Sequence, residues 1–470
     1  MTRGPTPVGR TVAVLAFAGL SASFMQTLVV PLQARLPALL GASSDDTPWV
    51  ITVTLVAATV VTPIAGRLGD MFGKRRVAVA LLIVQAVGAV LAGLAEDLPL
   101  MLVARALQGV AAGVVPLGIS ILRDVVAPGR MGSATALVSA TLGVGGALGL
   151  PLSAYAAEAL DWHAIFWFAA VLSVAAIALY LRVVPASALR TPARIDVVGM
   201  AGLAVGLVGV LIAVSRGGTW GWADQRTLGF LIGGLVVLVL WTLWELRVRD
   251  PLIDLRAALN GAVLITNIAS VAVGFGLFAS SITFPQLLVL PEATGIGLGL
   301  PLVVAALILA PSGLMMLAVS PVAGWIQRRH GPRPLLVVGS LVVAVGYALA
   351  LVLRSEAWQI LVVNILLGIG VGLAYAAMPA LIMRAVPVSQ TGAANGLNAL
   401  ARSLGTTAAA AVIGALLAQS TVTVGGATGP SGAGFTAALA LGLGAALIGA
   451  IVAAAIPRPS AAEPATPDRP

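Results

Sequence analysis

The sequence contains no cysteine and little charge. Charged residues make up 9% of the 470 positions, whereas soluble domains carry about 25%. The missing cysteines exclude disulfides, thiolate metal sites and cysteine nucleophiles. So few charges cannot cover several soluble domains, and a hydrophobic content of 59% excludes a disordered chain. An all-α polytopic membrane protein remains as the fold class.

Long apolar runs occur throughout the chain. A helix that crosses the bilayer core needs about 20 apolar residues. Runs of this kind, separated by charged residues, Pro or Gly, predict fourteen spans. They are Thr11–Pro31, Trp49–Ala65, Val77–Leu94, Leu100–Leu122, Ser133–Tyr155, Ala164–Val184, Val197–Val214, Thr227–Trp244, Ala262–Leu287, Leu300–Val322, Leu335–Leu353, Gln359–Leu381, Thr391–Ala418 and Gly434–Ile456.

The basic residues fall mainly on one side of these spans. With the N-terminus inside, 20 Lys and Arg residues lie in inner segments and 4 in outer segments, among them Arg216. Arg105 and Arg402 are left within spans. This bias predicts that both termini are cytoplasmic, and it explains the net charge of +9 without nucleic acid as a partner.

Part of the second span recurs in the tenth. Four residue pairs share an offset of 258, namely Pro63/Pro321, Gly66/Gly324, Gly73/Gly331 and Arg75/Arg333. A duplication of six spans then leaves the seventh and eighth as an insert, a 6+2+6 plan with the site between the halves. The predicted domains are a first half (1–190), the insert with its linkers (191–259), a second half (260–457) and a disordered tail (458–470).

The stretch after the second span resembles the signature loop of the major facilitator superfamily. Its matching residues are Gly66, Arg67, Gly69, Asp70, Gly73, Lys74 and Arg75. The resemblance implies the major-facilitator fold and a cytoplasmic gate, in which Asp70 pairs with bases and with a helix N-terminus of the other half. The glycines are expected to permit a tight turn with positive φ. A plain basic loop is the alternative. Arg328 stands where Asp70 would repeat, so the expected gate is asymmetric.

Two further stretches resemble family elements. Arg105 and Gln108 in the fourth span match an R-x-x-Q-G element, which implies a role in coupling or substrate charge; snorkelling of Arg105 to the membrane surface is the alternative. In the fifth span, Gly145, Gly149 and Pro151 resemble the antiporter motif, although Leu150 interrupts its Gly-Pro pair. Ordinary close helix packing explains these glycines equally well.

The insert resembles the fourteen-helix drug:proton antiporter branch of this superfamily. The branch-like features are Asp196, the stretch Glu245–Leu255, and Gly392–Asn398 with Arg402. The resemblance implies a secondary transporter that exports drugs or metabolites from a bacterial inner membrane by alternating access. The partners implied are a small-molecule substrate, protons and the lipid bilayer. A monomer without cofactor or metal is expected.

Proton coupling is the least supported part of this resemblance. The branch usually carries an acid where this chain has Met25, and none of its acids lies at the centre of a span. A proton relay normally needs a titratable group within the membrane. The coupling candidates are therefore peripheral acids or buried polar groups: Asp70, Glu158, Glu292, Arg105, Gln108 and Arg402. Transport without proton coupling stays open as an alternative.

Polar, aromatic and soft side chains on the pore-facing spans are candidate substrate contacts. They are Gln26, Asn267, Phe275, Phe278, Asn364, Tyr375 and Met378, and core packing is the alternative for each. A lining without acids is expected to suit neutral, zwitterionic or anionic compounds. An intramembrane enzyme is a distant alternative, since the two histidines fall in loops.

Overall fold

Nearly all of the described chain is helical. The computed structural model describes residues 8–33, 35–43, 46–159, 161–186, 194–259, 261–424 and 427–457, apart from the side chains of 157–159, 257, 424, 427 and 428. The tail expected to be disordered, 458–470, lies outside these residues. A two-stranded antiparallel hairpin of β1 (Thr421–Val424) and β2 (Ala427–Pro430), which the sequence did not predict, is the one sheet of the described chain.

Fourteen of the described helices are long and apolar enough to cross a membrane, which confirms the predicted number. The first six spans are α1 (Val8–Thr27) with η1 (Val30–Leu32), α3 (Trp49–Phe72), α4 (Lys74–Gly93), α5 (Leu98–Gly109) continued by η2 (Val110–Gly113) and α6 (Val114–Val125), α7 (Pro128–Ala159), and α8 (Ala164–Val183). The next two are α9 (Val197–Trp220) and α10 (Gln225–Glu245).

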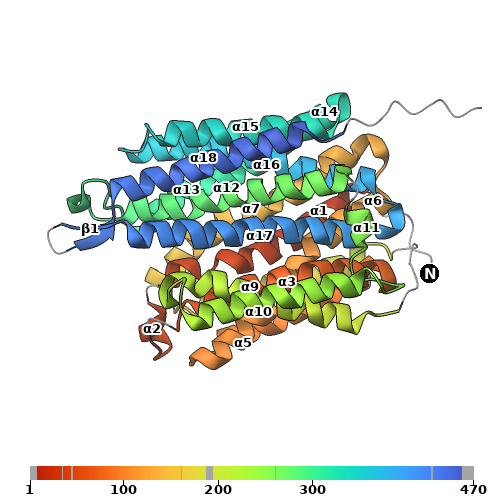
Figure 1. The fold of residues 1–470 in the computed structure, drawn as a ribbon, viewed down its shortest axis with the longest axis horizontal. Helices are drawn as coiled ribbons and strands as arrows, with labels where there is room; N and C mark the ends of the chain where they lie inside the picture. Colours follow the sequence, from red (N-terminus) through yellow and green to blue (C-terminus); the bar gives the residue numbers. More distant parts are fainter. Residues whose placement is uncertain are drawn as a thin grey trace, which may run out of the picture.

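The last six spans are also long helices, some of them continued by a short helix. They are α12 (Gly261–Val289), α13 (Leu302–Ala318) with α14 (Ser320–His330), α15 (Pro332–Ala350), α16 (Ala357–Ala385), η4 (Val388–Gln390) with α17 (Thr391–Gln419), and α18 (Gly432–Ala454). The remaining short helices are α2 (Leu36–Leu39), α11 (Leu255–Ala258) and η3 (Glu292–Thr294). Figure 1 shows the long helices running side by side along the longest axis of the molecule.

The first six and last six spans meet along two seams. At one seam α3 packs on α17, and at the other α7 packs on α13 and α14. Glycines bring the backbones together at the second seam: a Cβ added to Gly313 would lie 2.1 Å from the carbonyl oxygen of Gly143. Small residues at such crossings are the usual means of close helix contact in membranes.

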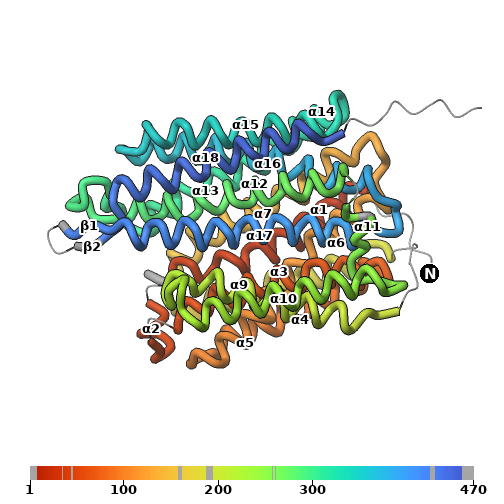
Figure 2. Tube along the Cα trace, viewed as in Figure 1, coloured from red at the N-terminus to blue at the C-terminus, as the bar shows by residue number. Residues whose placement is uncertain are grey.

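The insert helices α9 and α10 pack on each other, and α9 also packs on α3 and α17 (Figure 2). An apolar cluster joins the insert and its linker to the α3/α17 seam; its buried members are Leu203, Leu207, Leu211, Leu252, Ile253 and Leu400. α9 ends at Trp220 instead of the predicted Val214. Arg216, expected in an outer segment, is therefore a buried helical residue, and its guanidinium carbon lies 4.3 Å from the ring centroid of Trp49.

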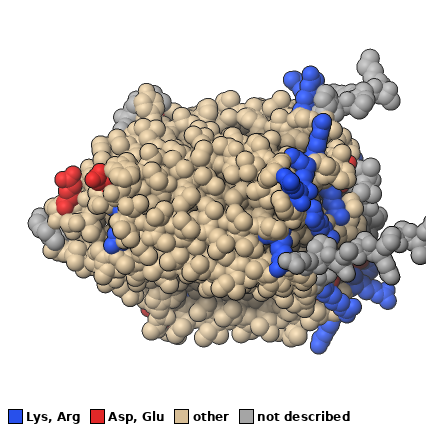
Figure 3. Space-filling model, turned by 90° about the horizontal axis from the view of Figure 1, so that it is seen from above, with Lys and Arg blue, Asp and Glu red and all other residues tan. Residues whose placement is uncertain are grey.

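Lys and Arg side chains gather at one end of the molecule, called the basic end here (Figure 3). α1 begins at this end, and α18 finishes there, where the Arg333 guanidinium donates to the carbonyl oxygen of Ala454. The basic end carries the segments predicted to be cytoplasmic, and the side of the membrane that it faces stays a prediction.

Gly145 provides a test of the helix packing. A Cβ on Gly145 would lie 2.4 Å from Cβ of Ser23 in α1. We expect Gly145→Val to destabilise the protein by about 1–3 kcal/mol through overpacking, measured as a lower midpoint of thermal unfolding in detergent. Gly414→Val is the control, because nothing lies within 4 Å of that position. Equal midpoints for the two variants would contradict the α1/α7 contact.

Candidate functional site

The motif expected as a loop is mostly helical. α3 continues through Phe72, and Gly73, with φ of 101°, is the residue that leaves the helix. The expectation of positive φ at Gly66 and Gly69 is therefore wrong. These glycines serve close packing instead: a Cβ on Gly69 would lie 2.3 Å from Cδ2 of Leu117. The same turn recurs in the second half, where Gly331 has φ of 82°.

Asp70 joins the two halves at the basic end. Its buried carboxylate accepts hydrogen bonds from the backbone amides of Gly392, at 3.1 Å, and of Ala393, at 2.9 Å. Both amides belong to the first turn of α17, where N–H groups have no partner within the helix and the helix dipole favours an anion. Asp70 therefore caps a helix of the other half across the α3/α17 seam.

Glycines make this capping contact possible. A Cβ on Gly66 would lie 2.2 Å from the carbonyl oxygen of Gly392, and one on Gly392 would lie 2.6 Å from Oδ1 of Asp70. One turn further along α17, a Cβ on Gly396 would meet the carbonyl oxygen of Thr62 at 2.8 Å. The two backbones therefore touch along the seam, and any larger side chain would hold Asp70 away from α17.

The basic residues of the motif have separate partners. The buried Lys74 ammonium lies 2.9 Å from Oδ1 and 3.0 Å from Oδ2 of Asp124 at the end of α6. It also lies 3.4 Å from Oγ1 of Thr391, the first residue of α17. Arg75 donates to the carbonyl oxygen of Leu181 near the end of α8, at 2.5 Å. Lys74 thus connects α4, α6 and α17 next to the Asp70 contact.

The corresponding place in the second half is built differently. A Cβ on Gly324 would lie 2.2 Å from Oγ of Ser133 in α7, so the close approach is repeated. Arg328, in the position of Asp70, donates to the Ser133 hydroxyl at 2.8 Å. The second seam therefore has a cation on a hydroxyl group where the first has an acid on a helix N-terminus.

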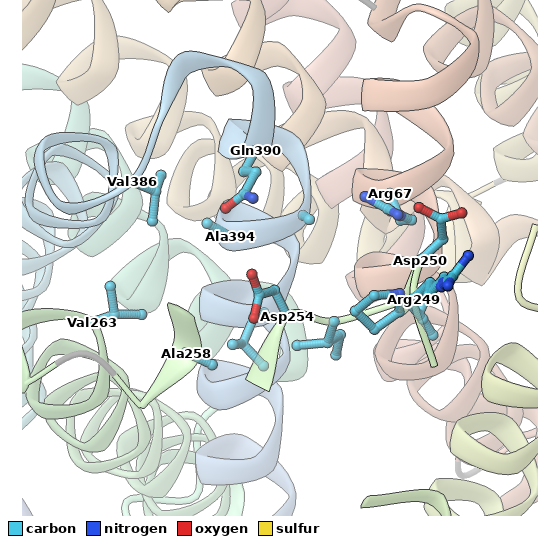
Figure 4. A pocket seen from close by; sticks show the side chains of 14 residues that line it. Arg67, Arg249, Asp250, Asp254, Ala258, Val263, Val386, Gln390 and Ala394 are labelled. Atoms are coloured by element: carbon cyan, nitrogen blue, oxygen red, sulfur yellow. The ribbon is translucent and has the colours of Figure 1, made fainter. Parts of the chain in front are cut away.

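A cavity of about 220 Å³ lies beside the Asp70 contact (Figure 4). Arg67 of α3 lines it, together with linker residues such as Asp250 and Asp254 and with Gln390 at the start of α17. At the end of α10, just before the linker, the buried Glu245 carboxylate accepts a hydrogen bond from the backbone amide of Ile253 in the linker, at 3.3 Å. The linker that follows the insert is therefore anchored next to the gate motif.

Arg105 is fully buried, which excludes the snorkelling alternative. Its Nη1 donates to the carbonyl oxygen of Met25 at 2.8 Å and to Oε1 of Gln108 at 2.5 Å, and its Nε donates to the carbonyl oxygen of Val50 at 3.3 Å. Nη2 has no hydrogen-bond partner, and no described carboxylate is within 4.0 Å. Arg105 is therefore a buried cation held by carbonyl and amide oxygens.

Arg402 lies at the centre of a second polar group, within the second half. Its guanidinium carbon is 5.3 Å from the ring centroid of Tyr375, and its Nη1 donates to Oδ1 of Asn398 at 2.7 Å. Asn398 Nδ2 donates in turn to Oδ1 of Asn267 at 3.0 Å and to Oγ of Ser270 at 2.8 Å. Three predicted residues therefore lie in one polar group. Tyr375 contacts Arg402 directly, and Asn398 links Arg402 to Asn267.

The other predicted residues do not form one site. Gly149 packs on Thr27 of α1, in support of the packing role left open for this motif, and Pro151 lies inside α7. Asn364 donates to the carbonyl oxygen of Leu309 at 2.8 Å, and Met378 is fully buried. The residues partly accessible on their helices are Gln26, Phe275 and Phe278. Glu292 is exposed in η3, and Glu158 is in α7 with a side chain outside the described part.

The histidines take no part in these contacts. His163 precedes α8, and hydrogen bonds from its backbone amide and ring lower the pKa of Asp161. That carboxylate is exposed and outside the spans, so it is an ionised loop residue.

Two residues of these contacts are absent from the candidates that the sequence predicts. Asp124 carries no motif, and Asn398 is only the last residue of the branch-like stretch Gly392–Asn398. Asn398 lies four residues before Arg402, one helical turn away, and this spacing was the available signal.

Comparisons with known proteins agree with this architecture. A family model described as Major Facilitator Superfamily matches residues 15–409 and 266–470. An uncharacterized MFS-type transporter of Mycobacterium tuberculosis is 31% identical over 68% of the chain, which spans only 48% of that relative. The tetracenomycin C resistance and export protein of Streptomyces glaucescens is 28% identical over 81% of this chain and 70% of its own length.

A solved structure has the same fold. The human organic anion transporter MFSD10 matches with a TM-score of 0.64 and 17% identity, over 94% of this chain and 99% of that one. At this identity the match concerns the fold alone.

The Lys74–Asp124 pair gives a test of the geometry next to Asp70. We expect Lys74→Met to lower stability by about 3–5 kcal/mol, because it leaves the Asp124 carboxylate without its partner. The double variant Lys74→Met/Asp124→Leu should recover most of the loss, measured as the midpoint of thermal unfolding. Arg76→Met, at an exposed position, is the control. A double variant as unstable as Lys74→Met would contradict the pairing.

Proposed function

Because the chain belongs to the major facilitator superfamily, we propose that it is a secondary active transporter that exports small organic compounds by alternating access. The single observation that carries this proposal is the Asp70 contact with α17. It ties one half to the other at one end of the bundle through a few hydrogen bonds. An interaction of this kind can be broken and re-formed as the two halves rock about a site between them.

The export direction and the type of substrate rest on the relatives. Export and resistance are named in the Streptomyces protein, which this chain resembles over most of its length. The membership in this superfamily agrees with the expectation that the chain is not an enzyme. We therefore propose a multi-pass protein of a bacterial inner membrane, acting as a monomer, with drugs or secondary metabolites as its substrates.

Proton coupling is part of the proposal, with Asp70 as the coupling acid. Asp70 is buried in the seam, and protonation would remove the charge that the α17 N-terminus favours. A proton bound here would therefore weaken the closed arrangement of the basic end. Transport without proton coupling is the second candidate, and it is favoured by Met25: its backbone carbonyl, not an acid, receives the hydrogen bond of Arg105.

Asp70→Asn tests the gate. The amide keeps the shape but removes the charge, and hydrogen bonds to a charged acceptor are worth about 1.5–3 kcal/mol. We expect at least a roughly tenfold loss of tetracenomycin C efflux from a pump-deficient host, with normal amounts of protein in the membrane. Asp224→Asn, at an exposed helix cap, should transport normally. Normal efflux by Asp70→Asn would refute the gate assignment.

An imposed pH gradient tests the coupling separately. Proteoliposomes containing the protein should accumulate the exported compound faster when the gradient is applied, and an uncoupler should remove this difference. If the transport rate is the same with and without the gradient, the export function stands and the alternative without proton coupling is selected.

A further inference from the structure

A second cavity, of about 100 Å³, lies between the insert and the two halves, away from the basic end. Four helices line it. Its lining residues include Thr52 and Val56 of α3, Leu211 and Ser215 of α9, and Phe278 of α12, together with one face of α17. The α17 residues that line it are Thr406, Thr407, Ala410 and Ala411. All three parts of the chain therefore form its wall, on the α3/α17 seam.

α9 is held firmly as one wall of this cavity. The Thr52 and Ser215 hydroxyl oxygens are 3.1 Å apart, and the Arg216 guanidinium stacks on Trp49 one residue further along α9. Leu211 is buried against the seam. These contacts hold the insert helix α9 against α3 beside the seam.

The polar groups of the cavity are acceptors. The Thr406 and Thr407 hydroxyls both donate to the carbonyl oxygen of Ser403, at 2.8 and 2.9 Å. The Thr52 hydroxyl donates to the carbonyl oxygen of Pro48 at 3.1 Å, an arrangement in which the Ser215 hydroxyl can donate to Thr52. With the donors used, oxygen lone pairs remain for a ligand, and no charged side chain lines the cavity.

The cavity lies close to the Arg402 group along two helices. Thr406 follows Arg402 by one helical turn on α17, about 6 Å along the axis. On α12, Phe278 is one turn beyond Phe275, whose backbone amide lies 3.0 Å from the position of a Cβ on Gly405. The cavity and the Arg402 group are therefore neighbours on α17 and α12.

We propose that this cavity is a substrate subsite, which takes an uncharged apolar group carrying an O–H or N–H donor, with the insert helix α9 as a specificity-determining wall. This assignment rests on the transport function proposed above. It gives the two-helix insert a role in choosing the substrate: its Leu211 and Ser215 set the width and polarity of the subsite. A rigid subsite of this size holds one ring or a short chain, not a whole drug.

Dye efflux with two matched probes tests the subsite. N-phenyl-1-naphthylamine carries one N–H donor, and its N-methyl derivative carries none. We expect the wild-type protein to export the first at least five times faster. Ala410→Leu fills the cavity and should reduce export of N-phenyl-1-naphthylamine at least fivefold, whereas Val412→Phe on the exposed side of α17 should not.

Thr407→Val is the second variant, because it removes a lone-pair acceptor with almost no change of shape. It should reduce the preference for the N–H probe, even where Ala410→Leu fails to reach the membrane. Equal export of both probes by the wild type, or an unchanged preference in Thr407→Val, would overturn the subsite. A wild type that exports neither these probes nor tetracenomycin C would instead overturn the proposed transport function.

Discussion

The carboxylate of Asp70 can reach the first amides of α17 only if two helices from opposite halves touch backbone to backbone. Gly66 on α3 and Gly392 and Gly396 on α17 supply that contact. The hydrogen-bonded cap depends on it, and the Lys74–Asp124 pair lies beside it. The glycines of the motif are therefore a condition for the charge interaction, because each one removes a Cβ that would separate acceptor from donor.

The repeated motif in the second half preserves the close helix contact but not the charge of the side chain beside it. Gly324 and Ser133 repeat the close crossing, and Arg328 replaces the acid. A cation is unfavourable at a helix N-terminus, so Arg328 uses the Ser133 hydroxyl instead of the helix amides. One seam thus carries a carboxylate on a helix N-terminus, and the other carries a guanidinium on a hydroxyl group. The two seams therefore repeat the same close packing with opposite charge.

Features that follow from apolar length or from regular spacing could be predicted from the sequence. Features that depend on contacts between helices far apart in the chain could not. The fourteen spans follow from apolar length, and the repeat at Gly73 and Gly331 follows from its spacing, with positive φ at both. The helical state of Gly66 and Gly69 could not be predicted, because it depends on Gly392 and Leu117, far away in sequence. The burial of Arg216 and the role of Asn398 likewise arise from contacts between helices.

Two arginines, the buried Arg105 and the partly buried Arg402, lie inside the bundle of described helices. Arg105 and Arg402 are satisfied by carbonyl, amide and aromatic partners, with no described carboxylate in salt-bridge contact with either. Unneutralised guanidinium groups in a medium of low dielectric constant repel cations over longer distances than in water. The same groups leave donors available to an anionic or neutral molecule. These charges favour the expectation from the sequence that neutral, zwitterionic or anionic compounds suit the interior better than lipophilic cations, and the uncharged lining of the cavity beside α9 is compatible with it.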